Sequence, residues 1–210
     1  MTIWNKIYRD YQAGGPAYAT LGEDLIPEFL DFLAGHDFPN RLVLDVGCGN
    51  GKYLDFLRGK AFIVEGLDSS PIAVAMAREA LQGKGTVIEA DMYEYKYPVQ
   101  QYCLVISIAA LHHGRKHQVR RAVQEIYSSL VPGGYFFVTL PDNSGSEHWS
   151  MMVEHEEIEP GTRVPLSGPE RGLPHASYTE EELDDLFKDF ANVEKSLLAE
   201  PGKWVVSARK

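Results

Sequence analysis

Residues 42–51, LVLDVGCGNG, join a short apolar run to glycines at every second position, Gly47, Gly49 and Gly51. The apolar run has the length of one buried strand, and a helical pattern begins at Lys52. Glycine has no Cβ, so such a turn can adopt left-handed backbone conformations and a ligand can approach the backbone closely. The segment therefore predicts a ligand-binding turn between a strand and a helix.

The rest of the chain alternates between strand-like and helical patterns. The predicted strands cover 41–46, 62–68, 86–90, 102–109, 135–140, 193–199 and 203–209. The predicted helices cover 1–13, 21–34, 52–57, 70–81, 116–130 and 180–190. Such alternation is typical of an α/β fold with a doubly wound, mostly parallel sheet, whose ligands bind beyond the carboxyl ends of the strands.

Two segments do not follow the alternation. Residues 1–34 read as a helical segment with an aromatic stripe of Trp4, Tyr8 and Tyr11, and Tyr18 follows it. Residues 141–178 are rich in Gly, Pro, Ser, Glu and His without a sustained period, which predicts an irregular insertion. We expect one domain over 1–210, with both segments covering the substrate side as lids.

Composition limits the classes of partner. The net charge of −10 argues against general binding to nucleic acid or anionic membranes. No apolar run approaches the ~20 residues of a membrane span, and two cysteines, Cys48 and Cys103, favour a reduced, cytoplasmic protein. The basic cluster is read as the exposed face of a helix; it comprises Arg115, Lys116, His117, Arg120 and Arg121.

Acidic residues mark the ends of the first three predicted strands. Asp45 precedes the glycine turn, where a carboxylate suits the ammonium of an amino-acid ligand, or serves as a capping acid. Asp68 closes the second strand and can accept hydrogen bonds from both hydroxyls of a ribose. Asp91 closes the third strand and can accept from the exocyclic amine of adenine. The three acids predict a nucleoside ligand.

At this point the motifs resemble a known family. LVLDVGCGNG, VEGLDSSPIAVAMA, VIEADMYE, LVISIAALHH and LVPGGYFFVTLPD are similar to the successive motifs of class I methyltransferases that use S-adenosylmethionine (SAM). YTEEELDDLFKDF and KWVVSARK resemble the last helix and last strand of the same family. The resemblance is to its small-molecule, tellurite-resistance-like type and its tRNA wobble-uridine type. It implies a Rossmann-like, seven-stranded sheet of order 3-2-1-4-5-7-6, with strand 7 antiparallel.

The resemblance also implies a cofactor site. SAM is the expected cofactor and S-adenosylhomocysteine the expected product, with the three glycines at the methionine part, Asp68 at the ribose, and Asp91 and Met92 around adenine. The expected contacts to SAM are Asp45, Gly47, Cys48, Gly49, Gly51, Asp68, Ser69, Asp91, Met92, Ser107, Tyr8 and Tyr18. Cys48 itself is read as a small space-filling residue in the turn.

The candidates for catalysis by a side chain are two histidines. His112 and His113 follow the fourth strand and are the candidates for a general base, since a histidine can take a proton near neutral pH. Methyl transfer from a sulfonium can instead proceed by alignment of the nucleophile alone. No metal site is expected: the acid and histidine run within 147–157 matches no standard ligand spacing and reads as a solvated loop.

The predicted function is methyl transfer from SAM to an unidentified small-molecule acceptor. One alternative is a tRNA wobble-uridine methyltransferase, against which the acidic balance argues. A second is a SAM-binding protein without transferase activity. A third is an NAD-dependent oxidoreductase, which the spacing G-x-G-x-G disfavours, because dinucleotide folds use G-x-G-x-x-G. The acceptor, the attacking atom and the oligomeric state are left open.

Overall fold

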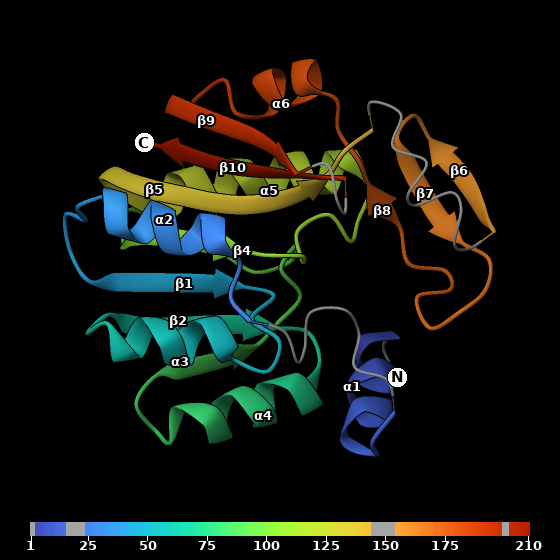
Figure 1. Cartoon of the computed structure of the whole chain (residues 1–210), viewed down its shortest axis with the longest axis horizontal. Coiled ribbons are helices and arrows are strands. Elements are labelled where there is room, and N and C mark those ends of the chain that lie inside the picture. The colour runs from blue at the N-terminus through green and yellow to red at the C-terminus, as the bar shows by residue number, and fades with distance from the viewer. Residues whose placement is uncertain (1–2, 16–23, 144–153, 199–201) are drawn as a thin grey trace.

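The computed structural model describes residues 3–15, 24–143, 154–198 and 202–210. Its centre is a seven-stranded sheet of order β3-β2-β1-β4-β5-β10-β9 (Figure 1). The strands are β1 Leu42–Val46, β2 Ile63–Asp68, β3 Thr86–Glu89, β4 Tyr102–Ser107, β5 Leu130–Pro141, β9 Ala191–Leu198 and β10 Lys203–Arg209. The predicted strand order is confirmed.

Strand directions follow the prediction as well. β1 pairs in parallel with β2 and β4, β2 with β3, and β4 with β5, whereas β10 runs antiparallel to both β5 and β9. All six residues of β4 are buried, as expected for a central strand covered on both faces. The parallel strands therefore end at one common edge, where the chemistry of such folds is placed.

Helices cover both faces of the sheet (Figure 1). α2 Pro27–Gly35, α3 Lys52–Gly59 and α4 Pro71–Leu81 pack on one face, and α5 Lys116–Ser129 and α6 Glu180–Leu186 on the other. α4 begins as the sequence predicts, with the Ser70 hydroxyl accepting from the Ala73 amide and Pro71 in the first turn. α6 has the predicted capping box between Thr179 and Glu182.

Two further parts lie beside the carboxyl ends of the parallel strands. In Figure 1, the arrows of β1 and β2 end on the side where helix α1 Ile3–Gln12 and a small sheet are found. That small sheet has the order β6-β7-β8, with strands His155–Glu159, Thr162–Pro165 and His175–Ala176. The expectation of an irregular insertion over 141–178 is therefore wrong for these three short strands. The strands are too short and too charged to show a strand period.

Some boundaries differ from the predictions for local reasons. α2 begins at Pro27 rather than at Leu21, because proline suits the first turn of a helix. β5 begins at Leu130, since its pairing with β4 shifts register between Tyr102 and Leu104 and absorbs the Pro-Gly-Gly segment. Among the described residues, no helix is long and apolar enough to cross a membrane.

Gly51 provides a test of the turn that β1 feeds. Its φ is +83°, and a Cβ added there would lie 2.9 Å from the Cβ of Ala77 in α4. We expect Gly51→Ala to lower the free energy of unfolding by about 1–3 kcal/mol, from backbone strain and overpacking. Gly59→Ala is the matched control, because a Cβ there meets nothing within 4 Å. Urea unfolding of both variants checks this; equal stabilities would contradict it.

Candidate functional site

The three glycines of the turn after β1 all have left-handed backbones, with φ of 77° at Gly47, 55° at Gly49 and 83° at Gly51. A side chain on Gly47 would collide with Ala110, which follows β4. The amides of Gly47 and Cys48 donate to the Leu67 carbonyl of β2, at 2.8 and 3.0 Å. The turn is thus packed against the ends of β2 and β4, with its backbone at the sheet edge.

Asp68 is the last residue of β2 and is buried. Its carboxylate accepts from the amide of Gly49 at 3.0 Å and from that of Ser70 at 2.8 Å. Burial raises the pKa of Asp68, while these backbone hydrogen bonds oppose the rise. The side chain therefore joins the glycine turn to the start of α4, where a ligand on the turn would meet it.

Asp45 lies in β1, one residue before its end, and is 3% exposed. Burial, and secondly the charge of Asp68, raise the pKa of Asp45 to about 8, and Lys52 acts in the opposite direction. Two buried carboxyl groups on neighbouring strands disfavour ionisation of both. The pair at the edge of the turn thus favours a ligand that brings positive charge and hydroxyl donors.

Helix α1 lies across this turn. A Cβ on Gly49 would lie 2.5 Å from the Tyr8 hydroxyl, so the phenol sits directly on the turn. The Ser70 hydroxyl donates to the Asn5 side chain at 3.0 Å, which connects α1 to α4. Burial, and then the charge of Asp68, raise the pKa of Tyr8, which keeps its hydroxyl a neutral donor. The structure thus brings the predicted Tyr8 to the site, whereas Tyr18 lies outside the described residues.

Asp91 does not close β3 as predicted, because β3 ends at Glu89. Asp91 is exposed and starts a turn, with its side chain accepting from the Tyr93 amide at 2.9 Å. Its neighbour Met92 does reach the turn: its Cε lies 3.8 Å from the position of a Cβ on Gly47. Of the two residues expected around adenine, the structure places Met92 at the turn.

Three other residues expected to contact SAM are packed against or bonded to other parts of the protein, or lie beside Asp68. The Ser107 hydroxyl is fully buried and donates to the Val46 carbonyl at 2.8 Å, which ties β4 to β1. Cys48 is buried with its Sγ packed on Gly66, in keeping with a space-filling residue. Ser69 is half-buried beside Asp68. Their contacts to a cofactor stay predictions.

A cluster of histidines lies past the end of β4. His112 and His113 are buried and meet His175 of β8, with ring centroids 5.7 and 4.8 Å from it. Burial is the first cause that lowers the pKa of each of the three, so all are neutral at pH 7. His175 was missed from the sequence, because the segment around it has no period or motif that marks a site.

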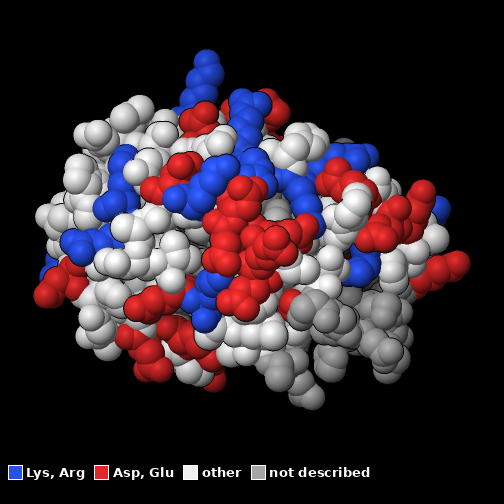
Figure 2. All heavy atoms as spheres, turned by 90° about the horizontal axis from the view of Figure 1, so that it is seen from above, with Lys and Arg blue, Asp and Glu red and all other residues white. Residues whose placement is uncertain are grey.

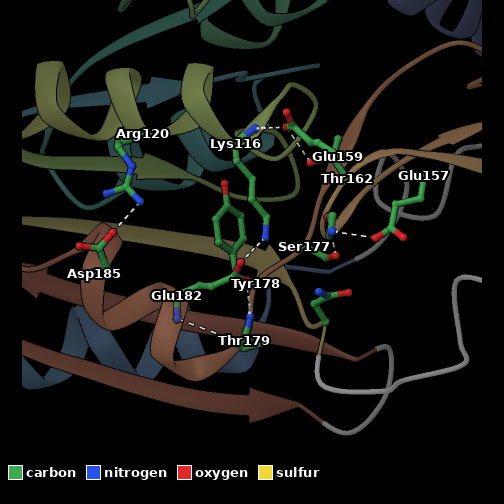
Figure 3. A network of polar contacts seen from close by, with 12 residues as sticks. Lys116, Arg120, Glu157, Glu159, Thr162, Ser177, Tyr178, Thr179, Glu182 and Asp185 are labelled. Atoms are coloured by element: carbon green, nitrogen blue, oxygen red, sulfur yellow. Dashed lines mark hydrogen bonds and ion pairs between the residues drawn. The ribbon is translucent and has the colours of Figure 1, made fainter.

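The basic cluster at the start of α5 is largely exposed, as expected, and three of its five residues are paired with acids. Figure 3 shows Lys116 beside Glu182, at 2.5 Å, and Arg120 beside Asp185, at 2.7 Å. Arg115 lies 3.6 Å from Glu159 of β6. The face in Figure 2 accordingly shows basic and acidic side chains side by side, not a continuous basic field. These pairs join the insertion and α6 to α5 and neutralise much of the cluster.

Comparison with known proteins agrees with this geometry. Residues 43–134 match the family model of the methyltransferase domain. The chain is 29% identical, over 78% of its length and 41% of the relative's, to a tRNA (carboxymethyluridine(34)-5-O)-methyltransferase of Arabidopsis thaliana. It is 36% identical to a trans-aconitate 2-methyltransferase of Escherichia coli, over 48% of this chain and 39% of that one.

A solved structure of a SAM-dependent methyltransferase from Methanosarcina mazei has the same fold, with a TM-score of 0.70, 21% identity, and coverage of 90% of this chain and 99% of that one. Residues 43–134 thus form a methyltransferase domain, in a fold shared with SAM-dependent methyltransferases. SAM is the cofactor of those methyltransferases. The chain spans about two fifths of the length of the tRNA methyltransferases that it matches.

The buried acid pair predicts an unusual dependence of stability on pH. The pKa of Asp45 is about 8 in the folded state against an ordinary 3.8, so the folded chain keeps a proton that the unfolded chain loses. This group therefore lowers the free energy of unfolding as pH rises from about 4 to about 8. Asp45→Asn does not titrate. We expect its stability relative to wild type to rise between pH 5 and pH 8 by at least ~1.4 kcal/mol, the equivalent of one pKa unit.

Urea unfolding of both proteins at pH 5, 6, 7 and 8 measures this difference. The comparison between the two proteins cancels the contributions of all other titrating groups. Parallel pH profiles would show that Asp45 ionises normally in the folded protein.

Proposed function

We propose that this protein binds SAM at the turn after β1 and transfers its methyl group to a carboxylate oxygen of a small-molecule acceptor. The observation that carries the cofactor assignment is the buried pair Asp45 and Asp68 beside three left-handed glycines. SAM supplies an ammonium and a sulfonium, which favour the ionised form of these carboxyl groups, and a ribose whose hydroxyls can donate to Asp68.

Two relatives support a carboxylate acceptor. The acceptors in their names, a carboxymethyluridine and trans-aconitate, both carry a carboxyl group. Arg163 of β7 provides positive charge on that side of this chain, since it lines one small cavity with His175, Ser177 and Asp142. Its guanidinium donates to Asn143 at 3.1 Å, which orients it. Arg163 therefore places one cation beside His175 of the insertion, and we take it as the candidate partner of an anionic acceptor group.

The chemistry needs alignment more than proton transfer. A carboxylate is already ionised at neutral pH, so no base has to remove a proton. An oxygen lone pair forms the new C–O bond as the S–CH₃ bond breaks, and the bond's electron pair goes to sulfur. The carboxylate and the sulfonium become a neutral ester and a neutral thioether, a change that exclusion of water by covering segments favours. His112 and His113 then have no required role as bases.

The small-molecule assignment rests on the covered site and on charge. α1 lies over the turn, and three of the five residues of the basic cluster are paired with Glu159, Glu182 and Asp185. A tRNA acceptor would need unpaired cations to meet its phosphates, and the net charge is −10. The second candidate, tRNA wobble-uridine methylation, is favoured by the relatives that match most of the chain.

Asp68→Ala tests the cofactor site. We expect it to weaken S-adenosylhomocysteine binding at least tenfold, about 1.4 kcal/mol, because it removes a charge-assisted ribose contact. Asp55→Ala is the control, since Asp55 lies on α3 and pairs with Arg58 at the surface. Calorimetric titration checks both variants, and unchanged affinity in Asp68→Ala would remove Asp68 from the site.

The acceptor assignment is tested by the bond formed. The protein is incubated with SAM labelled in its methyl group and, in separate reactions, with each candidate acceptor. The candidates are small di- and tricarboxylic acids, amines, thiols and bulk tRNA. We expect label in a carboxylic acid, released as methanol by mild alkali, because esters hydrolyse under conditions that leave N- and C-methyl groups intact. Alkali-stable label, or alkali-labile label in tRNA alone, would contradict the small carboxylate acceptor.

A further inference from the structure

We propose that His112, His113 and His175 form a binding site for a divalent transition-metal ion of the zinc class. Each offers one ring nitrogen, and these three atoms all lie within 4.8 Å of one another. The side chains come from two places, the segment after β4 and strand β8 of the insertion. Among the described residues, these three histidines are the cluster whose potential ligand atoms lie close enough together to hold a metal ion. The sequence pattern alone predicts no metal site.

An unsatisfied nitrogen points to a missing ligand. Nδ1 of His112 is buried and has no hydrogen-bond partner among the described residues. Leaving a buried polar atom unsatisfied costs on the order of 1–3 kcal/mol, so such atoms in folded proteins call for an explanation. Coordination of an ion shared with the two neighbouring imidazoles supplies the partner that this nitrogen lacks.

A hydrogen bond orients the His113 ring as in metal sites, and a carboxylate lies beside the His175 ring. Nδ1 of His113 donates to the Ala110 carbonyl at 2.9 Å, which directs Nε2 away from the backbone. The Glu170 carboxylate lies 3.5 Å from Nε2 of His175. Histidine ligands commonly bond a carbonyl or a carboxylate through the second nitrogen, which fixes the tautomer and the ring orientation.

The backbone holds the two contributing segments together before any ion binds. The amide of Ala176 in β8 donates to the His112 carbonyl at 2.8 Å. The Trp4 ring of α1 packs edge-on against His113, with ring centroids 4.7 Å apart, and covers the cluster. The site is therefore largely preformed. Nitrogen ligands of a tetrahedral zinc ion lie about 3.4 Å apart at Zn–N distances of 2.0–2.1 Å, so small ring rotations complete it.

The donor set selects the class of ion. Neutral imidazoles suit zinc, copper, nickel and iron, whereas magnesium and calcium require oxygen ligands. Burial keeps these three rings unprotonated at pH 7, the state in which an imidazole coordinates. Three protein ligands leave a fourth position of a tetrahedral ion open to water or to another oxygen ligand. An ion here would also connect the insertion to the end of β4.

Zinc binding by the full chain without a histidine tag, stripped with a chelator, tests the proposal. Zn²⁺ alone is titrated in competition with a chromophoric chelator. We expect one ion per chain with a Kd of about 1 μM or tighter. His112→Gln and His175→Gln should weaken it roughly tenfold or more, because each removes one ligand. His175→Cys should retain zinc, since a thiolate can ligate in its place.

His117→Gln is the matched control, because His117 is exposed on α5 outside the cluster, and its affinity should equal that of wild type. Visible absorption of the wild-type protein with Co²⁺ gives a readout that does not depend on any variant folding: strong bands indicate tetrahedral nitrogen coordination. The proposal is overturned if wild type binds no Zn²⁺ at about 10 μM, if His117→Gln loses as much affinity as His175→Gln, or if the Co²⁺ bands are weak and octahedral.

This experiment is separate from the test of the cofactor. S-adenosylhomocysteine binding to the stripped protein probes Asp68 and the glycine turn, whereas Zn²⁺ binding without any nucleoside probes the histidines. Either result can fail while the other holds, so the two proposals stand or fall independently.

Discussion

Asp45 and Asp68 lie buried on adjacent strands at the edge of a turn made of left-handed glycines, and the arrangement costs stability while no ligand is bound. Burial raises the pKa of both carboxyl groups. Their position follows from the fold, because β1 and β2 run in parallel and end at the same edge. A ligand with a cation and a ribose relieves this cost, which is why we place SAM there.

The parts around this edge are held in place by ordinary surface and packing interactions. α1 places Tyr8 on Gly49 and Trp4 on His113, and so spans the glycine turn and the histidine cluster. The insertion is joined to α5 by the Arg115–Glu159 pair and by the bond from the Lys116 amide to Glu159 at 2.9 Å (Figure 3). The basic cluster of α5 thus helps to position the insertion beside the site, a role that its charge alone did not suggest.

The sequence predicts those features that depend on residues close together in the chain, and it does not predict contacts that depend on how distant segments fold back. The glycine turn and the seven strands follow from local periodicity and turn chemistry. Their order in the sheet is what the resemblance to the methyltransferase family implies, and the structure confirms it. Asp68 could be placed because strand ends in parallel sheets converge. His175 could not, because its proximity to His112 depends on how the insertion folds back, which no local pattern encodes. The small sheet β6-β7-β8 was missed for the same reason, as its strands are short and charged.

We propose that SAM binds at the turn between Asp45 and Asp68. Calorimetric titration with S-adenosylhomocysteine at pH 7, in two buffers of different ionisation enthalpy, tests it most directly. We expect one site of micromolar affinity and release of protons on binding, since the ligand's ammonium favours the ionised form of Asp45, whose pKa is about 8. Absence of binding, or binding of NAD in its place, would contradict it.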